Sequence, residues 1–514
     1  MIASERNVWK PVPMTRPDLP VEQQVRLHAQ SRPHDLAIVA AGNRWTWQEL
    51  DIHSDRLAAG LQERGLRAGE RIAWSGRNEA WQPALMIACL RTGIVPVGIN
   101  WRLTSAELTP ILKLVGPRLL VARVSFASET GLNRIEPERL AREARYDHLS
   151  TVASPKEDDR PAAIFLTSGS TGAPKARMLR RNALHARLCA PNALDLDGDA
   201  RLLIAAPFFH VAGWAWTLFA LAGGLRQIVA SHTEPAGLLD LIASEGVTHA
   251  QWLPSMLEAL LREQSEKPRD TSSLRMVAYG AGAVERETLN AAQATFDTGF
   301  CQVYGLTETA AAIGHLDAEV HRRRRNHTQL PTIFPDPDIA ITITDGEGLL
   351  LPQGQIGEVR IADRQPPVEG LTPDGPICLL DQQGRIPTGD LGWIDEEGFL
   401  HLVGRADEII ITGGENVHPG EVEEVLNKSA MVAEACVFSL HDKEWGEKIC
   451  AAIVPHGDVV DTRALTDFCR EHLAGFKVPR TYVIVRELPR TATGKVRRKE
   501  LASLVTGTQT VETS

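Results

Sequence analysis

The sequence offers little cysteine chemistry. It has seven cysteines in 514 residues, an odd number, and no two of them form a C-x-x-C pair. Disulfide frameworks and zinc sites are built from paired or clustered cysteines, so the sequence argues against both. The cysteines are Cys89, Cys189, Cys301, Cys378, Cys436, Cys450 and Cys469.

Long apolar runs and a basic face are also missing. No uninterrupted apolar run approaches membrane-spanning length, and residues 1–20 lack an apolar core between a basic flank and a cleavage site. The formal net charge of -10 opposes binding to nucleic acid or anionic lipid. We therefore expect a cytoplasmic protein with no nucleic-acid partner and no membrane span.

Helical and strand-like segments alternate along most of the chain. Residues 46–65 and 81–92 carry apolar side chains at helical spacing, and the second predicted helix ends at Gly93. The short apolar segments between helices are typical of buried strands. This alternation predicts the α/β class with parallel sheets, and the length predicts at least two domains. The predicted strands are 71–74, 94–99, 119–124, 162–166, 201–205, 227–229 and 276–277.

The pattern changes twice toward the C-terminus. Residues 339–361 alternate polar and apolar side chains around an Asp345-Gly-Glu-Gly turn, which predicts an antiparallel hairpin or a small β-barrel-like subdomain. Beyond Gly404 the pattern predicts a compact α+β domain of about 110 residues. The elements expected in it are helices at 419–428 and 462–473 and strands at 432–440 and 449–455.

A loop rich in small residues follows the strand predicted to end at Leu166. Its glycines let a polyphosphate approach the backbone, its hydroxyls donate hydrogen bonds, and its final lysine supplies positive charge. The spacing does not match a Walker loop. A flexible Ser/Gly surface loop is the alternative, disfavoured because the segment follows a buried strand and ends in Pro-Lys. The candidate phosphate-binding residues are Thr167, Ser168, Gly169, Ser170, Thr171, Gly172 and Lys175.

This loop resembles the signature phosphate loop of the adenylate-forming superfamily. That superfamily contains acyl-CoA synthetases, the adenylation domains of nonribosomal peptide synthetases, and luciferases. One departure is Ala176, because the family usually has glycine after the lysine. The resemblance implies ATP and Mg²⁺ as ligands, and further segments extend it, in the family's order, over nearly the whole chain.

Two segments resemble the family's contacts to the nucleoside. The turn Tyr279-Gly-Ala-Gly-Ala283 resembles the one on which adenine and part of the acyl group rest, which implies contacts from Gly280 and Ala281. Thr388-Gly-Asp390 resembles the motif whose carboxylate accepts hydrogen bonds from both ribose hydroxyls. Two carboxylate oxygens suit a vicinal diol.

The segment Tyr304-Gly-Leu-Thr-Glu308 resembles the family's Y-G-x-T-E motif. The resemblance implies that Tyr304 stacks on adenine and that Thr307 meets the α-phosphate. It also implies that Glu308, with Thr171 of the loop, binds Mg²⁺, a hard cation that prefers oxygen ligands. Without the motif, Tyr304 would be assigned to the core and Glu308 to the solvated surface.

The segment Gly404-Arg-Ala-Asp407 resembles the family's hinge, with an ordinary surface turn as the alternative. The resemblance implies that Arg405 contacts ribose or phosphate and that Asp407 is the pivot of a mobile C-terminal domain. The implied boundaries are 1–404 for the large N-terminal domain, 405–408 for the hinge and 409–514 for the small domain.

The loop ending at Lys495 resembles the one that carries the family's catalytic lysine. The resemblance implies that its ammonium neutralises charge between the attacking carboxylate and the α-phosphate. Ile411-Thr-Gly-Gly-Glu-Asn416 resembles the loop lining the pantetheine tunnel of coenzyme A, which implies a role for Gly413 and Gly414. Four cations of this domain are either ligands of CoA phosphates or a solvated basic face. They are Lys477, Arg480, Arg497 and Arg498.

The segment Pro207-Phe-Phe-His-Val-Ala-Gly-Trp214 resembles the acyl side of CoA ligases. It has His210, a candidate catalytic residue, near the place where amino-acid-activating relatives carry an aspartate, so amino acids are disfavoured. Aromatic side chains nearby suggest an aromatic or medium-sized apolar acid, unless they are core residues. These candidate pocket residues are Trp214, Trp216, Trp252 and Tyr279.

The resemblance is weakest between Glu308 and Thr388. The run from His321 to His327, with its four arginines, is either a solvated loop or an anion clamp, and Gln365 to Gly375 is expected to be a loop. The function implied overall is an AMP-forming acyl-CoA synthetase for a small carboxylic acid. An amine or carrier-protein acceptor, a small oxyanion substrate such as nitrite, a non-enzymatic nucleotide-binding module and a homodimer are left open.

Overall fold

The computed structural model divides the chain into two compact units. The first contains residues 1–341 and 361–387, and the second contains residues 342–360 and 388–514. The expected hinge at 405–408 stays a prediction. The residues that the structure describes are 10–123, 131–143, 159–167, 175–190, 192–282, 284, 286–324, 330–363, 369–412, 415–442, 445–457, 460–491, 496–504 and 510–512.

A nine-stranded sheet of order β15-β14-β13-β12-β11-β9-β10-β1-β2 lies in the first unit. Its strands run parallel from β13 to β1, with antiparallel neighbours at both edges. The strands are β1 (Leu36–Ala40), β2 (Asn43–Thr46), β9 (Arg201–Ile204), β10 (Arg226–Val229), β11 (His249–Trp252), β12 (Met276–Gly280), β13 (Gly299–Gly305), β14 (Ala312–Leu316) and β15 (Phe334–Pro335).

An eight-stranded sheet of order β19-β18-β8-β7-β4-β3-β5-β6 lies in the same unit. Strands from β7 to β6 along this order are parallel, and those from β7 to β19 are antiparallel. The strands are β3 (Arg71–Ser75), β4 (Val95–Ile99), β5 (Leu119–Ala122), β6 (Arg134–Ile135), β7 (Pro161–Thr167), β8 (Lys175–Arg180), β18 (Glu369–Thr372) and β19 (Gly375–Ile377).

Helices cover these sheets, and their ends follow local sequence signals. Helix α2 begins with a capping box between Thr46 and Glu49, and α3 ends at Gly93, whose φ of 71° is left-handed. Both predicted helices are therefore confirmed. The helices of this unit are α1 (Val21–Ser31), α2 (Trp47–Glu63), α3 (Trp81–Thr92), α4 (Ser105–Val115), α5 (Pro137–Arg142), α6 (Arg181–Cys189), α7 (Val211–Gly223), α8 (Pro235–Glu245), α9 (Pro254–Glu266), α10 (Arg286–Phe296) and α11 (Ala318–Arg323).

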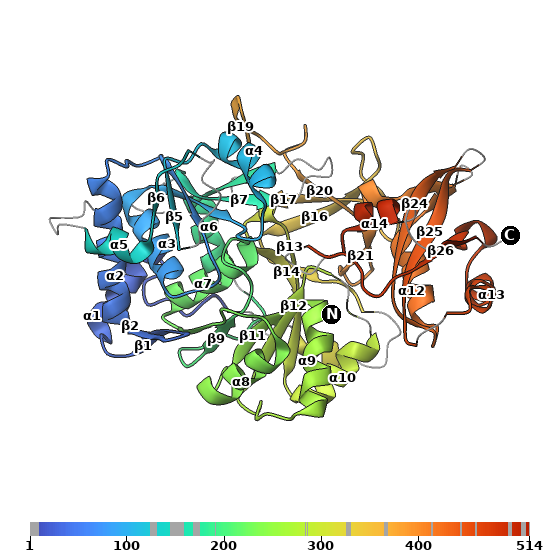
Figure 1. The fold of residues 1–514 in the computed structure, drawn as a ribbon, viewed down its shortest axis with the longest axis horizontal. Coiled ribbons are helices and arrows are strands. Elements are labelled where there is room, and N and C mark those ends of the chain that lie inside the picture. The colour runs from blue at the N-terminus through green and yellow to red at the C-terminus, as the bar shows by residue number, and fades with distance from the viewer. Residues whose placement is uncertain are drawn as a thin grey trace. The chain divides into compact units, whose positions relative to one another are not determined.

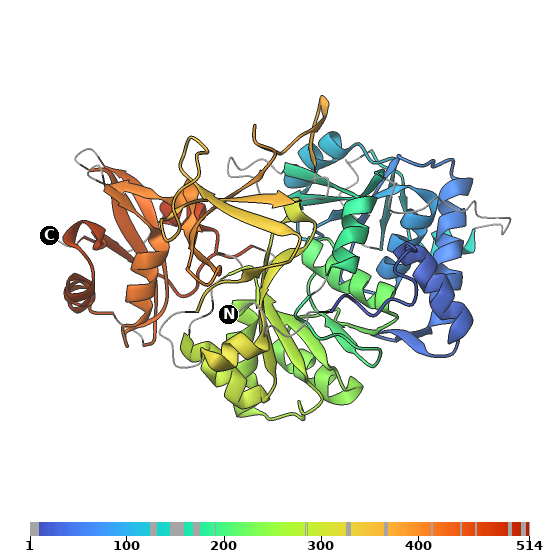
Figure 2. The same cartoon turned by 180° about the vertical axis from the view of Figure 1, so that it is seen from behind.

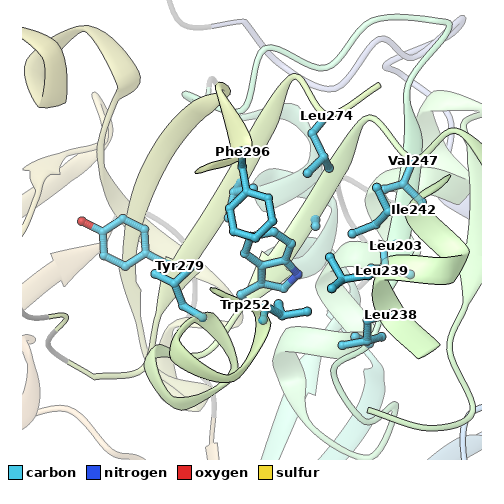
Figure 3. Packing of buried hydrophobic residues seen from close by; sticks show 14 of the residues in the cluster. Leu203, Leu238, Leu239, Ile242, Val247, Trp252, Leu274, Tyr279 and Phe296 are labelled. Carbon is cyan, nitrogen blue, oxygen red and sulfur yellow. The ribbon is translucent and has the colours of Figure 1, made fainter. Parts of the chain in front are cut away.

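A hydrophobic core lies between the nine-stranded sheet and α8, α9 and α10, which lie together along one face of the sheet (Figure 1, Figure 2). Figure 3 shows Trp252 and Phe296 in this core, with ring centroids 5.1 Å apart, and Tyr279 to one side. The buried apolar area of this core is a main source of the unit's stability.

The second unit is built on two sheets. A four-stranded sheet of order β16-β17-β20-β21 belongs mostly to it, and confirms the predicted β segment after Ile339. A six-stranded sheet follows, in which β24 and β25 pair antiparallel. The helices α12 and α13 of this unit match the two predicted helices. The elements are β16 (Ile339–Thr344), β17 (Gly357–Asp363), β20 (Ile386–Ile394), β21 (Leu400–Arg405), β22 (Ile410–Thr412), β23 (Glu415–Val417), α12 (Pro419–Asn427), β24 (Val432–Asp442), β25 (Gly446–Pro455), α13 (Thr462–His472), β26 (Thr481–Ile484), α14 (Arg498–Leu504) and β27 (Thr510–Glu512).

Two expectations for irregular structure are wrong where residues are described. Residues 369–372 of the expected loop form β18, which pairs with β8 and buries Leu371, because pairing with an available strand outweighs the local loop composition. The basic run begins inside α11 rather than in a loop, and His321 is buried. Arg322 and Arg323 are exposed, and Arg323 forms an ion pair with Glu319.

Every helix in the described part of the chain is too short or too polar to cross a membrane.

Candidate active site

The expected phosphate loop connects two antiparallel strands. Thr167 ends β7 and Lys175 begins β8, and their Cα atoms are partners in the ladder. The Thr167 hydroxyl donates to the Lys175 carbonyl at 3.4 Å, while the Lys175 side chain is exposed. Ser168, Gly169, Ser170, Thr171 and Gly172 lie outside the described residues, so their roles stay predictions.

The expected metal carboxylate follows β13, on a short 3₁₀ turn at Thr307–Thr309. The Thr309 hydroxyl accepts from the Leu306 amide at 2.9 Å, and Arg187 Nε donates to the Thr309 carbonyl at 3.1 Å. These bonds fix the backbone that presents Thr307 and Glu308, both of which are partly exposed. Tyr304 is largely buried at the end of the same strand.

Strand β8, which follows the expected phosphate loop, is in direct contact with the turn at Thr307–Thr309, which carries the expected metal carboxylate. Arg177 Nε, two residues after Lys175, donates to Glu308 Oε1 at 2.6 Å. The two side chains are 12% and 22% exposed, so the pair is partly shielded from water. Two motifs 131 residues apart in the sequence therefore meet in one place. Sequence reasoning missed Arg177, because nothing in its neighbourhood indicates which carboxylate it faces.

The described residues contain no group of three or more His, Cys, Asp or Glu side chains that could hold a metal. Mg²⁺ is commonly held by one or two carboxylates together with substrate phosphates, rather than by a cage of side chains. One partly exposed glutamate beside an expected phosphate loop fits that mode of binding.

The turn after β12 requires an unusual backbone. A Cβ on Gly280 would lie 2.4 Å from the Val303 carbonyl oxygen, so only glycine fits there. Ala281 is exposed with φ of 66°, a left-handed conformation that costs a non-glycine residue about 1 kcal/mol or more. Such strain is concentrated at binding sites, which agrees with the predicted nucleotide contact.

Tyr279 points into the protein from the same turn. Its hydroxyl lies 2.9 Å from His321 Nε2 and 3.2 Å from Gln302 Oε1, and burial raises its pKa. His321 Nδ1 lies 2.7 Å from the Asp317 carbonyl, an acceptor, so Nδ1 carries the proton and Nε2 accepts from Tyr279. Burial lowers the pKa of His321 to about 4 and keeps it neutral. Tyr279 therefore joins β12 to α11, and this favours a structural role over a pocket role.

The expected acyl segment leads into α7. His210, half-buried, is the N-cap residue of that helix, with its ring 4.7 Å from the Phe209 ring. Trp214 is buried and packs edge-to-face against Phe165 at 5.4 Å, and Trp216 is buried on the same helix. Phe165 lies on β7, so this helix packs against the strand that enters the phosphate loop.

A residue far away in the sequence shapes this segment. Asn78 donates to the Ala206 carbonyl at 2.9 Å and accepts from the Phe208 amide at 3.0 Å. These bonds hold the turn that precedes His210. No sequence pattern pointed to Asn78, because its partners lie about 130 positions later in the chain.

Trp252 lies in the apolar core beneath α8, α9 and α10. Its side chain is fully buried among apolar residues of β11, α9 and α10 (Figure 3). This placement favours the core-packing alternative for Trp252.

The core placement gives a stability prediction. Trp252→Ala should lower the free energy of unfolding by about 3–5 kcal/mol, since it removes a large buried ring and leaves a cavity. The preference among acids should not change. Urea unfolding monitored by circular dichroism tests the first point, with Trp252→Phe as the milder control. A changed acid preference with unchanged stability would instead identify Trp252 as a pocket residue.

In the second unit, the expected ribose and hinge residues are close together. Arg405 Nη1 donates to Asp390 Oδ1 and to the Thr388 carbonyl, each at 2.9 Å. The Thr388 hydroxyl donates to the Val359 carbonyl at 2.7 Å. Arg405 Nε also contacts Asp407 Oδ1 at 3.3 Å. The antiparallel pair β20–β21 thus orients a largely buried carboxylate and its cation within one unit.

The cations considered for CoA phosphates all have partners within the protein. Lys477 pairs with Glu421 at 2.5 Å, and Arg497 pairs with Glu500 at 2.7 Å. Arg480 lies 3.9 Å above the Trp445 ring. Arg498 pairs with Glu408 and Glu423. These contacts favour structural roles, and the CoA role stays a prediction. Lys495, Gly413 and Gly414 lie outside the described residues.

Comparison with known proteins gives the same assignment across the chain. The family described as AMP-binding enzyme matches residues 25–366, and the AMP-binding enzyme C-terminal domain matches residues 421–495. A fatty acid–[acyl-carrier-protein] ligase, ScoC, from Streptomyces coeruleorubidus is 33% identical over 93% of this chain and 95% of its own. A feruloyl-CoA synthase from an Amycolatopsis species is 31% identical over 92% and 96%.

A solved structure has the same fold. The o-succinylbenzoate CoA synthetase MenE from Bacillus subtilis, in complex with its acyl-adenylate intermediate, has a TM-score of 0.81 and 28% identity, covering 94% of this chain and 98% of its own. That enzyme is also known in complex with ATP and magnesium ion. The family match spans well over half of the chain and agrees with the motifs placed above, so this chain belongs to the AMP-binding enzyme family.

Proposed function

We propose that this protein is an ATP-dependent, AMP-forming acid–thiol ligase. It joins a small carboxylic acid to AMP with release of pyrophosphate, and then transfers the acyl group to coenzyme A. The relatives named above include a CoA synthase and a CoA synthetase with an acyl-adenylate intermediate, and both support this reading.

The observation that supports the proposal most is the contact between Arg177 and Glu308. It brings the strand that begins with Lys175 next to the expected metal carboxylate, although the two segments are remote in sequence. A triphosphate between them would meet positive charge on one side and a metal site on the other.

The chain's own residues then have distinct tasks. Lys175 and the loop before it bind phosphate, and Glu308 holds Mg²⁺, which when bound neutralises phosphate charge and orients the oxygens. Asp390 accepts the ribose hydroxyls. Lys495 stabilises the charge that develops as the carboxylate attacks phosphorus. In the second half-reaction, rotation about Asp407 brings Gly413 and Gly414 to the pantetheine thiol.

The acid is proposed to be aromatic. The feruloyl and o-succinylbenzoate enzymes both act on aromatic acids by name, and they match nearly the whole chain. A fatty acid passed to a carrier-protein thiol is the second candidate, because the ScoC ligase has the higher identity. A cytoplasmic location remains part of the proposal. A measurement of the protein's mass in solution decides between a monomer and a homodimer.

Two assays test the proposal. Exchange of labelled pyrophosphate into ATP should appear only with an accepted acid, which reports adenylate formation. Mass spectrometry after incubation with ATP, Mg²⁺, CoA and a panel of aromatic and fatty acids should then show an acyl-CoA. Exchange without acyl-CoA would favour a carrier-protein or amine acceptor. If the exchange of labelled pyrophosphate into ATP stays at the background rate with every acid, the proposed adenylation is refuted.

A further inference from the structure

The positively charged guanidinium of Arg177 lies against the Glu308 carboxylate, which is expected to bind magnesium. Its Nε lies 2.6 Å from Glu308 Oε1, a distance typical of a strong charge-assisted hydrogen bond. An arginine guanidinium in a protein is a cation with five N–H donors and no acceptor. The pair is also partly shielded from water, which strengthens the attraction.

The strand geometry shows why the arginine reaches this place. Side chains two residues apart point to the same face of a strand, so Arg177 shares its face with Lys175. Arg177 is opposite Phe165 in the β7–β8 ladder and opposite Gly370 in the β8–β18 ladder. Backbone pairing on both sides holds its Cα, and the side chain extends from a rigid strand to Glu308.

Two cations would then use the same carboxylate of Glu308, the Arg177 guanidinium and Mg²⁺. A glutamate that is paired with arginine at one oxygen is a weaker ligand for Mg²⁺, because the metal must compete with the guanidinium for the same negative charge. We propose that Arg177 is a resident counter-cation of Glu308, which Mg²⁺ displaces when it enters with the nucleotide. Arg177 is then a positioning residue that sets the magnesium concentration the protein requires. This inference rests on the proposed function of Glu308.

The alternative is that the ion pair only fastens β8 to the turn at Thr307–Thr309. That turn has a second attachment, since Arg187 Nε donates to the Thr309 carbonyl. The chain also offers a matched control for a structural role. Arg180, on the same strand, pairs with Glu369 at 2.6 Å, with both side chains similarly shielded, but Glu369 belongs to no predicted metal site.

The experiment measures binding rather than turnover. Isothermal titration of the full-length protein with a non-hydrolysable ATP analogue, repeated over a series of Mg²⁺ concentrations, gives the Mg²⁺ concentration for half-maximal nucleotide affinity. Arg177→Gln should lower this midpoint by roughly tenfold, the ratio expected when one charge-assisted hydrogen bond no longer competes. Arg177→Lys retains the charge and should stay closer to the wild-type midpoint.

Controls separate charge competition from structural weakening. Arg180→Gln removes the ion pairs with Glu369 and Asp159 from the same strand and should leave the midpoint unchanged. In a Glu308→Gln background, Arg177→Gln should no longer shift the midpoint, because the two residues act through one interaction. Melting temperatures of all variants show whether each is folded.

Several outcomes would overturn the inference. These are an unchanged or higher midpoint in Arg177→Gln, an equal shift in Arg180→Gln, or a shift in Arg177→Lys as large as in Arg177→Gln. Weaker nucleotide binding at saturating Mg²⁺ with an unchanged midpoint would make Arg177 a phosphate ligand instead. If the wild-type protein binds no nucleotide at any Mg²⁺ concentration, the proposed function itself fails, which is a separate result.

Discussion

Lys495→Ala is expected to lower the rate of adenylate formation by about 100-fold or more, the scale for removing one preorganised electrostatic contact from a transition state. The resemblance places its ammonium between the attacking carboxylate and the α-phosphate, where negative charge accumulates during in-line displacement. Pyrophosphate release measured in a single turnover checks this directly.

The same variant should spare the second half-reaction. When a synthetic acyl-adenylate is supplied, thioester formation with CoA creates no pyrophosphate and should be little changed. Lys428→Ala is a suitable control, because Lys428 is an exposed lysine of the same unit that pairs with Glu424 at the surface. If Lys495→Ala releases pyrophosphate at the wild-type rate, the assignment of Lys495 is wrong.

Glu308→Gln should also reduce adenylate formation by about 100-fold or more, because the neutral amide has the size of the carboxylate but cannot balance the charge of Mg²⁺. Its effect should grow as the Mg²⁺ concentration is lowered. Pyrophosphate release measured across a magnesium series tests both points.

A second carboxylate with a similar ion pair serves as the control for Glu308. Glu369→Gln weakens the contact with Arg180 in the same way that Glu308→Gln weakens the contact with Arg177. It should lower stability slightly and leave the magnesium dependence intact. Equal losses of activity in both variants would mean that the ion pairs act on the fold, and not on the metal.

Local signals accounted for the boundaries of many elements. The capping box at Thr46 defines the start of α2 through hydrogen bonds within a few residues, and the left-handed backbone of Gly93 ends α3. The short apolar segments between the helices correctly indicated parallel strands, because the strands of a sheet covered on both faces are apolar on both faces. These features depend on near neighbours, so they can be predicted from the sequence.

Predictions failed or stayed open where distant segments meet. Composition favoured a loop at residues 369–372, but these residues form β18, because backbone pairing with the edge of β8 stabilises a strand there. Three tryptophans had equal standing as pocket or core residues in the sequence, and the packing of α8, α9 and α10 placed Trp252 in the core. His321 read as part of a basic run, yet its neutral ring accepts from Tyr279 inside the protein.

The sequence by itself determined the α/β class and the family, and it predicted the phosphate loop and the other nucleotide contacts, because these signals lie in short contiguous stretches. Only the tertiary structure decided that Arg177 faces Glu308 and that Asn78 shapes the turn before His210. Both contacts join residues more than 120 positions apart. Their geometry depends on which strands are neighbours in a sheet and in which register, and no local pattern of residues encodes that.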